Sequence, residues 1–282
     1  MRHSFSPVRR AMILAALAGA APLGAAGAAP AAEVPSLDAV IAGPQRSAAN
    51  KARDVYRHPR QTLQFFGLQP GQTVIEIAPG DGWYTEILAP YLRDRGKLYA
   101  AHYEPGGANA ERARSRARYE AKLRQDPDVY GKVTVGTLPV KAFTDIHPPG
   151  GADMVLTFRN IHNWMKDGHF DDTLRAFYAV LKSGGVLGVE EHRARPGTSL
   201  AQMIASGYVT EDYVIEHARA AGFQLAARSE INANPRDTKD YPQGVWTLPP
   251  TLREGDKDRA KYLAIGESDR MTLRFVKPAA AR

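Results

Sequence analysis

A single carboxylate lies inside an apolar run, and a glycine-rich loop follows it directly. Residues 74–88 read VIEIAPGDGWYTEIL, in which Glu76 is the one charged side chain before Pro79. A carboxylate is costly to bury without a partner, and a cationic ligand group would supply one, whereas a phosphate would not. Gly80 and Gly82 allow a ligand to approach the backbone closely. The stretch therefore predicts a binding site for a ligand with a cationic group.

The same loop differs from the fingerprint of dinucleotide-binding proteins. That fingerprint is Gly-x-Gly-x-x-Gly, and here Thr85 stands where the third glycine belongs. A nicotinamide-dependent oxidoreductase is therefore a weaker interpretation of the loop.

A second group of reactive residues follows a predicted strand at 153–158. The segment 159–164 reads RNIHNW, and the imidazole of His162 is a group that can transfer protons near neutral pH. We predict His162 and Asn163 as catalytic residues, with His162 as a general base. The alternative is that both side chains only form hydrogen bonds within a loop.

Glu191 and His192 follow another predicted strand and could bind a polar substrate group or a metal ion. His102, His162 and His192 would all lie at carboxyl ends of strands, and histidine triads do bind metals. However, these histidines are far apart in the chain, and the chain has no cysteine. We therefore predict no metal site and keep the histidine triad as the alternative.

Strands and helices alternate along the chain, and this alternation positions the candidate residues at one edge of a sheet. It predicts an α/β fold, Rossmann-like, with a seven-stranded, mostly parallel sheet and helices on both faces. Ligands bind such sheets beyond the carboxyl ends of the strands, which is where APGDGWY would lie. The predicted strands are 74–77, 97–101, 132–137, 153–158, 186–190, 224–229 and 271–277.

The motif Glu76-Ile77-Ala78-Pro79-Gly80-Asp81-Gly82 resembles the first motif of the class I S-adenosylmethionine-dependent methyltransferases. The stretch LKSGGVL at 181–187 is similar to their Leu-Lys-Pro-Gly-Gly turn before the fifth strand. The late strands suit their sheet, in which the last strand is reversed. More narrowly, FRNIHNW at 158–164, EHR at 191–193 and the tail from Gly244 resemble a bacterial group of predicted exported methyltransferases.

This resemblance covers roughly residues 45–278 and implies S-adenosylmethionine as the cofactor. It implies that Glu76 faces the methionine ammonium group and that the substrate meets the methyl group near 159–164. The acid that binds the ribose belongs at the end of the second strand, where His102 stands, so Glu104 is expected to bind the ribose instead. The residues expected to bind the cofactor are Glu76, Ala78, Gly80, Gly82, Tyr84, His102, Glu104, Arg159 and Asn160.

The N-terminal residues have the layout of a secretory signal, with basic residues, an apolar run and then small residues. Arg9-Arg10 resembles a twin-arginine signal, which exports folded proteins, and an ordinary secretory signal is the alternative. We predict a signal peptide at 1–28, a linker or arm at 29–50 and a methyltransferase-like domain at 51–282, with a lid or insert at 230–265. The expected location is periplasmic or secreted, without stable membrane insertion after the signal is removed.

The charge of the chain gives no sign of a nucleic-acid partner. Its 282 residues carry a net charge of +7, but loss of residues 1–28 removes three arginines and no acids, which lowers the charge to +4. The chain also lacks the basic runs that nucleic-acid binders usually show. A small molecule is therefore the expected partner, and the sequence leaves the oligomeric state open.

Two functions fit these patterns. The first is an S-adenosylmethionine-dependent methyltransferase that acts on an unidentified small molecule. Because the cofactor is made inside the cell, the second is an exported, non-catalytic protein that binds a ligand or a metal on a methyltransferase fold.

Overall fold

Seven strands form one sheet in the residues that the computed structural model describes, which are 1, 3, 4 and 35–279. The strand order is β3-β2-β1-β4-β5-β7-β6, and β7 runs antiparallel to both of its neighbours while the other pairs are parallel. The predicted Rossmann-like fold with a reversed last strand is thus confirmed. The strands are β1 (Thr73–Ile77), β2 (Lys97–His102), β3 (Thr134–Thr137), β4 (Ala152–Phe158), β5 (Leu181–His192), β6 (Gln224–Ser229) and β7 (Arg270–Val276).

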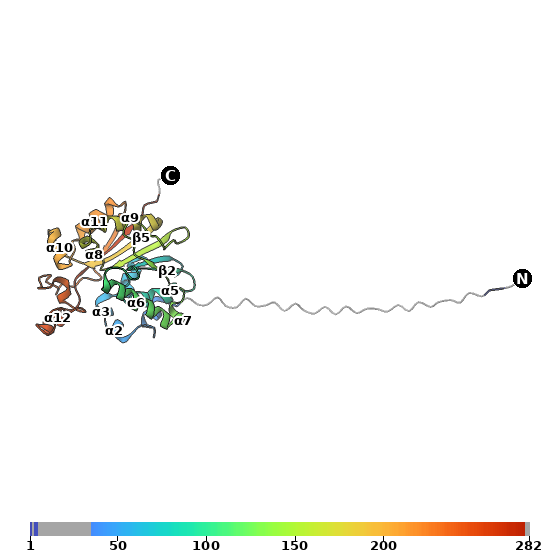
Figure 1. Cartoon of the computed structure of the whole chain (residues 1–282), viewed down its shortest axis with the longest axis horizontal. Coiled ribbons are helices and arrows are strands. Elements are labelled where there is room, and N and C mark those ends of the chain that lie inside the picture. The colour runs from blue at the N-terminus through green and yellow to red at the C-terminus, as the bar shows by residue number, and fades with distance from the viewer. Residues whose placement is uncertain (2, 5–34, 280–282) are drawn as a thin grey trace. The chain divides into compact units, whose positions relative to one another are not determined.

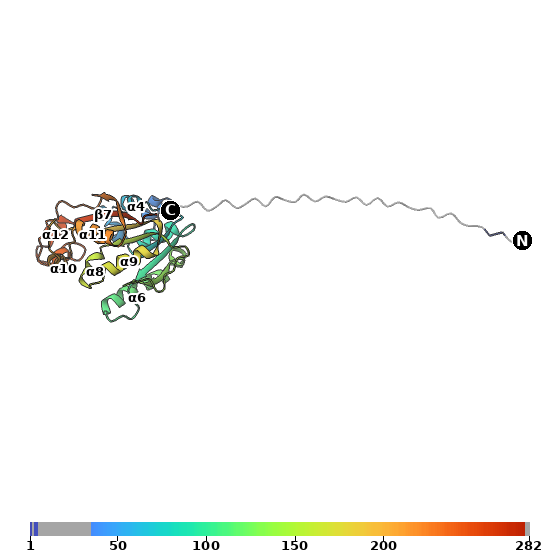
Figure 2. The same ribbon diagram turned by 90° about the horizontal axis from the view of Figure 1, so that it is seen from above.

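Helices cover both faces of the sheet (Figure 1). In the turned view α8, α9 and α11 lie near one another (Figure 2). Both α8 and α11 contact α9. The helices are α1 (Leu37–Ala42), α2 (Ala48–Lys51), α3 (Asp54–Arg57), α4 (Pro59–Phe66), α5 (Thr85–Leu92), α6 (Ala110–Gln125), α7 (Pro127–Tyr130), α8 (Ile161–Lys166), α9 (Phe170–Val180), α10 (Leu200–Ser206), α11 (Glu211–Ala220) and α12 (Arg259–Ile265), with a 3-10 helix η1 (Gly244–Thr247).

Side chains of the central strands alternate between two apolar cores, one on each face of the sheet. Ile75 and Val155 pack in the core that α8, α9 and α11 complete, whereas Val74 and Met154 pack in the core that α4 and α5 complete. Glu76 is two residues from Val74, so it points to the face that α4 and α5 cover. The alternation thus directs this carboxylate toward the start of α5.

The N-terminal region that the structure describes is helical and packed on the main body. α1 contacts α4 and α5, and Ser36 and Ser47 cap α1 and α2 by accepting hydrogen bonds from backbone N–H groups. The predicted linker or arm therefore contains α1 and most of α2, joined by a turn at residues 43–47. The predicted signal peptide, including Arg9-Arg10, lies outside the described residues except for positions 1, 3 and 4, and residues 29–34 lie outside them as well.

The segment 230–265, predicted as a lid or insert, contains η1 and α12 and is tied to the sheet by side chains. The Tyr208 hydroxyl donates to the carboxylate of Asp237 at 3.0 Å, and the side-chain amide of Asn232 donates to the hydroxyls of Thr62 and Thr272 at 3.0 Å. Its role as a lid stays a prediction.

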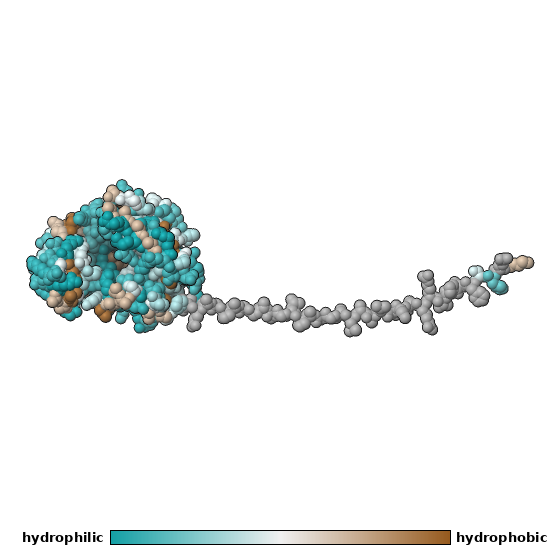
Figure 3. Space-filling model, turned by 60° about the horizontal axis from the view of Figure 1, so that its bottom comes forward, coloured by the Kyte–Doolittle hydropathy of each residue, from teal (hydrophilic) through white to brown (hydrophobic). Residues whose placement is uncertain are grey.

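The surface shown in Figure 3 is mainly hydrophilic, with small hydrophobic spots scattered over it. Among the described helices, none combines the length and the apolar character that a membrane span requires.

Candidate functional site

A cavity of about 270 Å³ lies at the carboxyl ends of β1 and β4, and residues of the short helices α2 and α3 line it as well. We call it the glycine-loop cavity, because the loop 78–84 forms one of its walls. Its polar lining includes Glu76 and three arginines, Arg53, Arg57 and Arg159. The other lining residues are Asn50, Ile77, Ala78, Pro79, Gly80, Asp81, Trp83, Tyr84 and Phe158.

Glu76 is buried in the wall of this cavity without a cationic partner. Its carboxylate accepts a hydrogen bond of 2.6 Å from the hydroxyl of Thr85, the first residue of α5, and only 1% of the residue is exposed. Burial raises the pKa of Glu76 to about 7, although Thr85 and the more distant Lys122 lower it in part. No Lys or Arg of the described residues forms an ion pair with it. A cation in the cavity would therefore keep this carboxyl group ionised.

Arg57 faces the same cavity with little to neutralise it. Its one side-chain hydrogen bond within the described chain runs from Nε to Glu267 at 3.3 Å, and its guanidinium group lies 4.6 Å from the centre of the Trp83 ring. Burial lowers the pKa of Arg57 well below its ordinary value, and the nearby charge of Arg159 lowers it further, against the opposing effect of Glu267. The terminal nitrogens of Arg57 are thus available to an anionic group.

Arg53 contributes a second guanidinium group with unused donors. Its Nε donates to Glu267 at 2.6 Å, while its Nη2 is buried and has no hydrogen-bond partner among the described residues. A buried donor without a partner is costly in proteins, so a ligand atom that accepts a hydrogen bond from it would be stabilising.

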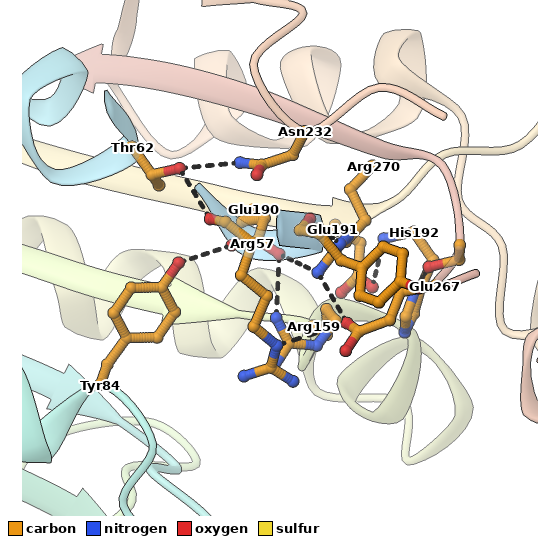
Figure 4. A network of polar contacts seen from close by, with 12 residues as sticks. Arg57, Thr62, Tyr84, Arg159, Glu190, Glu191, His192, Asn232, Glu267 and Arg270 are labelled. Atoms are coloured by element: carbon orange, nitrogen blue, oxygen red, sulfur yellow. Dashed lines mark hydrogen bonds and ion pairs between the residues drawn. The ribbon is translucent and has the colours of Figure 1, made fainter. Parts of the chain in front are cut away.

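These arginines belong to a larger set of buried charges, which we call the arginine network (Figure 4). Glu190 pairs with Arg159 at 2.9 Å and with Arg270 at 3.0 Å, and Glu267 pairs with Arg53, Arg57 and Arg270. The network contains four guanidinium groups and two carboxylates, so it holds two more positive than negative charges. An anionic ligand group would balance part of this excess.

Two residues that leave the strands at this cavity have left-handed backbone angles. Ala78 follows β1 with φ of 45°, and Arg159 follows β4 with φ of 61°. Their N–H groups donate to the carbonyls of Ala101 and Glu190, each at 2.7 Å, which fixes both turns. Such angles cost about 1 to 3 kcal/mol in residues other than glycine and are concentrated at functional sites. Both strand ends are therefore held in a strained form where they meet the cavity.

A second cavity, of about 620 Å³, lies at the carboxyl ends of β2 and β3, and we call it the β2–β3 cavity. Glu104, predicted to bind a ribose, lines it together with Tyr103, Arg112, Thr137 and Leu138.

His102 fixes the glycine loop and lines neither cavity. Its Nδ1 accepts a hydrogen bond of 2.8 Å from the Tyr103 N–H, so its Nε2 carries the proton and donates to the Gly80 carbonyl at 3.0 Å. Burial lowers the pKa of His102 to about 4, which keeps the ring neutral. The residue in the predicted ribose position thus holds the loop in place.

Other residues predicted to bind the cofactor pack against the glycine loop or form hydrogen bonds with the strand ends. A side chain at Gly82 would come within 3.2 Å of the Tyr119 ring, so glycine is needed there for close packing. The Asn160 side-chain amide donates to the Ile77 carbonyl at 3.1 Å, and the Tyr84 hydroxyl donates to Glu190 at 3.1 Å. Among the predicted set, Glu76, Ala78, Gly80, Tyr84 and Arg159 line the glycine-loop cavity.

His162 and Glu191, predicted as separate candidates, form a buried pair. The Nδ1 atom of His162 lies 3.0 Å from Oε1 of Glu191, which also accepts the His192 N–H at 2.8 Å. The rings of His162 and His192 have centroids 5.4 Å apart, and Trp246 of η1 contacts His162 with a centroid distance of 5.9 Å. Asn163, the other predicted catalytic residue, follows His162 on α8 and is half-buried. The structure thus brings together two of the three histidines of the alternative triad, without His102.

Several lining residues are absent from the sequence prediction, namely Asn50, Arg53, Trp83 and Phe158. One signal was present, because Arg53 and Arg57 are four residues apart and residues with that spacing share a helix face. Glu190 was also missed, since its partners Arg159 and Arg270 are distant in the chain.

No family model matches the sequence, and no curated protein matches it. Solved structures do match in shape. A SAM-dependent methyltransferase from Aquifex aeolicus is 16% identical with a TM-score of 0.54, and the match covers 80% of this chain and 93% of that one. The cyclase SpnF is 16% identical with a TM-score of 0.57, covering 84% and 85% of the two chains. A protein from Galdieria sulphuraria assigned as a sarcosine dimethylglycine methyltransferase is 11% identical with a TM-score of 0.56, covering 84% and 89%. At these identities the likeness establishes the fold.

Proposed function

We propose that this protein is an S-adenosylmethionine-dependent methyltransferase that acts on a small molecule. The observation that carries the proposal is the glycine-loop cavity, where a buried carboxyl group and guanidinium groups with unused donors line one space. The methionine end of the cofactor carries an ammonium group and a carboxylate, so it matches both. Two of the solved structures that share the fold are named methyltransferases.

Residues of the two cavities match the methionine end and the ribose of this cofactor. Glu76 would pair with the ammonium group, and Arg57 and Arg53 would bind the carboxylate, which supplies a partner for the orphaned Nη2 of Arg53. Glu104 would bind the ribose hydroxyls at the β2–β3 cavity, which is large enough for a nucleoside. When bound, the cofactor supplies an electrophilic methyl group on a positively charged sulfur.

On the acceptor side, the chain's contribution is positioning and proton transfer. His162 donates from Nδ1 to Glu191, which leaves its Nε2 as the nitrogen that can accept a proton from the acceptor. Glu191 in turn is fixed by the Ile161 N–H, which donates to its Oε2 at 2.6 Å. His162 therefore remains our candidate for the general base.

The binding experiment uses the mature chain, residues 29–282, and titration calorimetry with S-adenosylmethionine and its demethylated product. We expect both to bind the wild-type protein, and Glu76→Gln to lose most of this affinity because the ammonium group loses its charged partner. Glu216→Gln, on the exposed side of α11, is the matched control and should bind as the wild type does. Equal affinity of the Glu76 variant and the control would contradict the proposed role of Glu76 in binding the ammonium group.

The arginine side of the cavity has its own comparison. Arg57→Leu should weaken binding of S-adenosylmethionine but leave its decarboxylated analogue much less affected, because only the former carries the carboxylate. Arg60→Leu, which removes an exposed arginine paired with Asp38, is the control. Turnover with candidate acceptors then separates an enzyme from a non-catalytic binding protein, since both would bind the cofactor.

A further inference from the structure

The cluster of His162, Glu191 and His192 has the composition of a transition-metal site. Each residue offers one ligand atom, and these three atoms lie within 4.8 Å of one another. Ligands of a zinc ion at about 2.0 to 2.2 Å lie roughly 3.3 Å apart, so small side-chain movements would close the set around an ion. Two imidazoles and one carboxylate are a ligand set known for such ions.

The charge of Glu191 supports a cation at this position. Glu191 is fully buried, and its partners are the N–H groups of Ile161 and His192 and the ring of His162. No Lys or Arg of the described residues forms an ion pair with it, whereas the adjacent Glu190 pairs with two arginines. A buried carboxylate without a cation is costly, and a metal ion would supply the missing positive charge.

Groups around the cluster form hydrogen bonds to the proposed ligands, as residues outside the coordination sphere do in metal sites. The hydroxyl of Ser268 lies 2.6 Å from Nδ1 of His192, and two backbone N–H groups fix Glu191. The arginines of the nearby arginine network are paired with Glu190 and Glu267, so their repulsion of a cation is reduced.

We propose that His162, Glu191 and His192 bind one divalent transition-metal ion such as Zn²⁺. The proposal goes beyond methyl transfer and does not depend on the cofactor. Three protein ligands leave a fourth position, which could take an oxygen or nitrogen atom of the acceptor. In that state His162 is a metal ligand and cannot act as a base. Only the metal-free protein could then use His162 to accept the acceptor's proton.

The experiment uses the whole mature chain without a histidine tag. The protein is stripped with a chelator, desalted, incubated with Zn²⁺ and freed of excess metal by gel filtration, after which elemental analysis counts the retained ions. We expect about one ion per chain, and with Co²⁺ the visible absorption bands of a site with nitrogen and oxygen ligands.

Variants localise the ion. His162→Gln and His192→Gln should each abolish retention, and Ser268→Ala should weaken binding by roughly 10- to 100-fold because it frees the His192 ring. The matched control is His217→Gln, which removes another histidine with a carboxylate partner, Asp171, from outside the cluster. Thermal melting in chelator shows whether each variant is folded. If a variant of a ligand residue does not fold, the reduced metal affinity of Ser268→Ala still tests the site.

Two outcomes would overturn the proposal. Either the wild-type protein retains no metal, or both histidine variants retain as much as His217→Gln does. Calorimetry with S-adenosylmethionine on the stripped protein distinguishes this failure from failure of the proposed function, because cofactor binding is expected without metal.

Discussion

Glu76 is a carboxyl group whose charge depends on what the cavity contains. With burial as the dominant effect and Thr85 as its hydrogen-bond donor, its pKa is raised to about 7, so protonated and ionised forms coexist near neutral pH. A cationic ligand favours the ionised form. The residue thus links ligand binding to proton release.

Glu76→Gln should flatten the pH dependence of stability. Because the pKa is about 7 when folded and about 4.3 in an unfolded chain, the folded protein binds more protons between these values. This contribution to stability is complete below a pH of about 4 and is lost as the pH rises through about 7. From about pH 5 to about pH 8 the wild type should therefore lose about 2 to 3 kcal/mol relative to the variant, measured by urea unfolding.

The comparison with the variant is essential because His102 acts in the opposite direction. Its pKa is lowered to about 4, so its contribution to stability rises with pH below about 6.5. His102 is present in both proteins and cancels in the difference. A wild type and variant with parallel pH profiles would show that Glu76 is ionised in the empty protein.

At the residue scale, the sequence predicted site residues that are close together in the chain, but it did not predict pairs of residues that are far apart in the chain. Glu76, Gly80 and Gly82 lie within seven residues, so their pattern was visible. The pairing of Arg57 with Glu267 joins residues 210 positions apart, and no local pattern indicates it. The His162–Glu191 pair also depends on the side-by-side positions of β4 and β5, which the predicted fold class allowed but did not specify.

At the scale of elements, the arginine network joins α3, the end of β4, β5 and the start of β7. Burial alone would raise the pKa of Glu267, but Arg57, Arg270 and Arg53 together lower it to about 2. Glu267 therefore joins α3 to the start of β7 through the guanidinium groups of Arg53, Arg57 and Arg270.

Glu267→Gln should destabilise the protein by about 3 to 5 kcal/mol, because it leaves buried arginines without their counter-charge. Urea unfolding at neutral pH measures the loss. Glu216→Gln, at an exposed position on α11, should remain close to wild type. Equal stability of the two variants would show that water reaches the arginine network and screens its charges.

Strands were easier to predict than short helices. Each predicted strand overlaps an observed one, because apolar runs bounded by glycine and proline are distinctive. The four-residue helices α2 and α3 and the six-residue α1 and α8 are too short to show an apolar period. α1 and most of α2 lie in the stretch predicted as a linker or arm, and α8 lies where a loop was the alternative prediction, although it carries His162.

At the scale of the whole molecule, the type of the predicted N-terminal signal would decide whether export takes place before or after folding. Replacement of Arg9 and Arg10 by lysine keeps the positive charge and removes the arginine pair. We expect export to fall strongly, because only a twin-arginine signal requires that pair. The measurement is the share of the protein in the periplasmic fraction of a bacterial host.

Arg60→Lys, an exposed change in the mature chain, is the control for expression. Undiminished export of the lysine pair would indicate an ordinary secretory signal, and cofactor would then have to be acquired outside the cytoplasm. Mass spectrometry of small molecules that co-purify with the exported protein would show which ligand it carries.

The position of β7 has a consequence for biosynthesis. β7 follows every other described element in the chain, yet it lies inside the sheet between β5 and β6. Its first residue, Arg270, is the one that joins Glu190 to Glu267. A ribosome must therefore translate past this strand before the sheet and the arginine network can close, so neither is complete on a nascent chain that lacks its last residues.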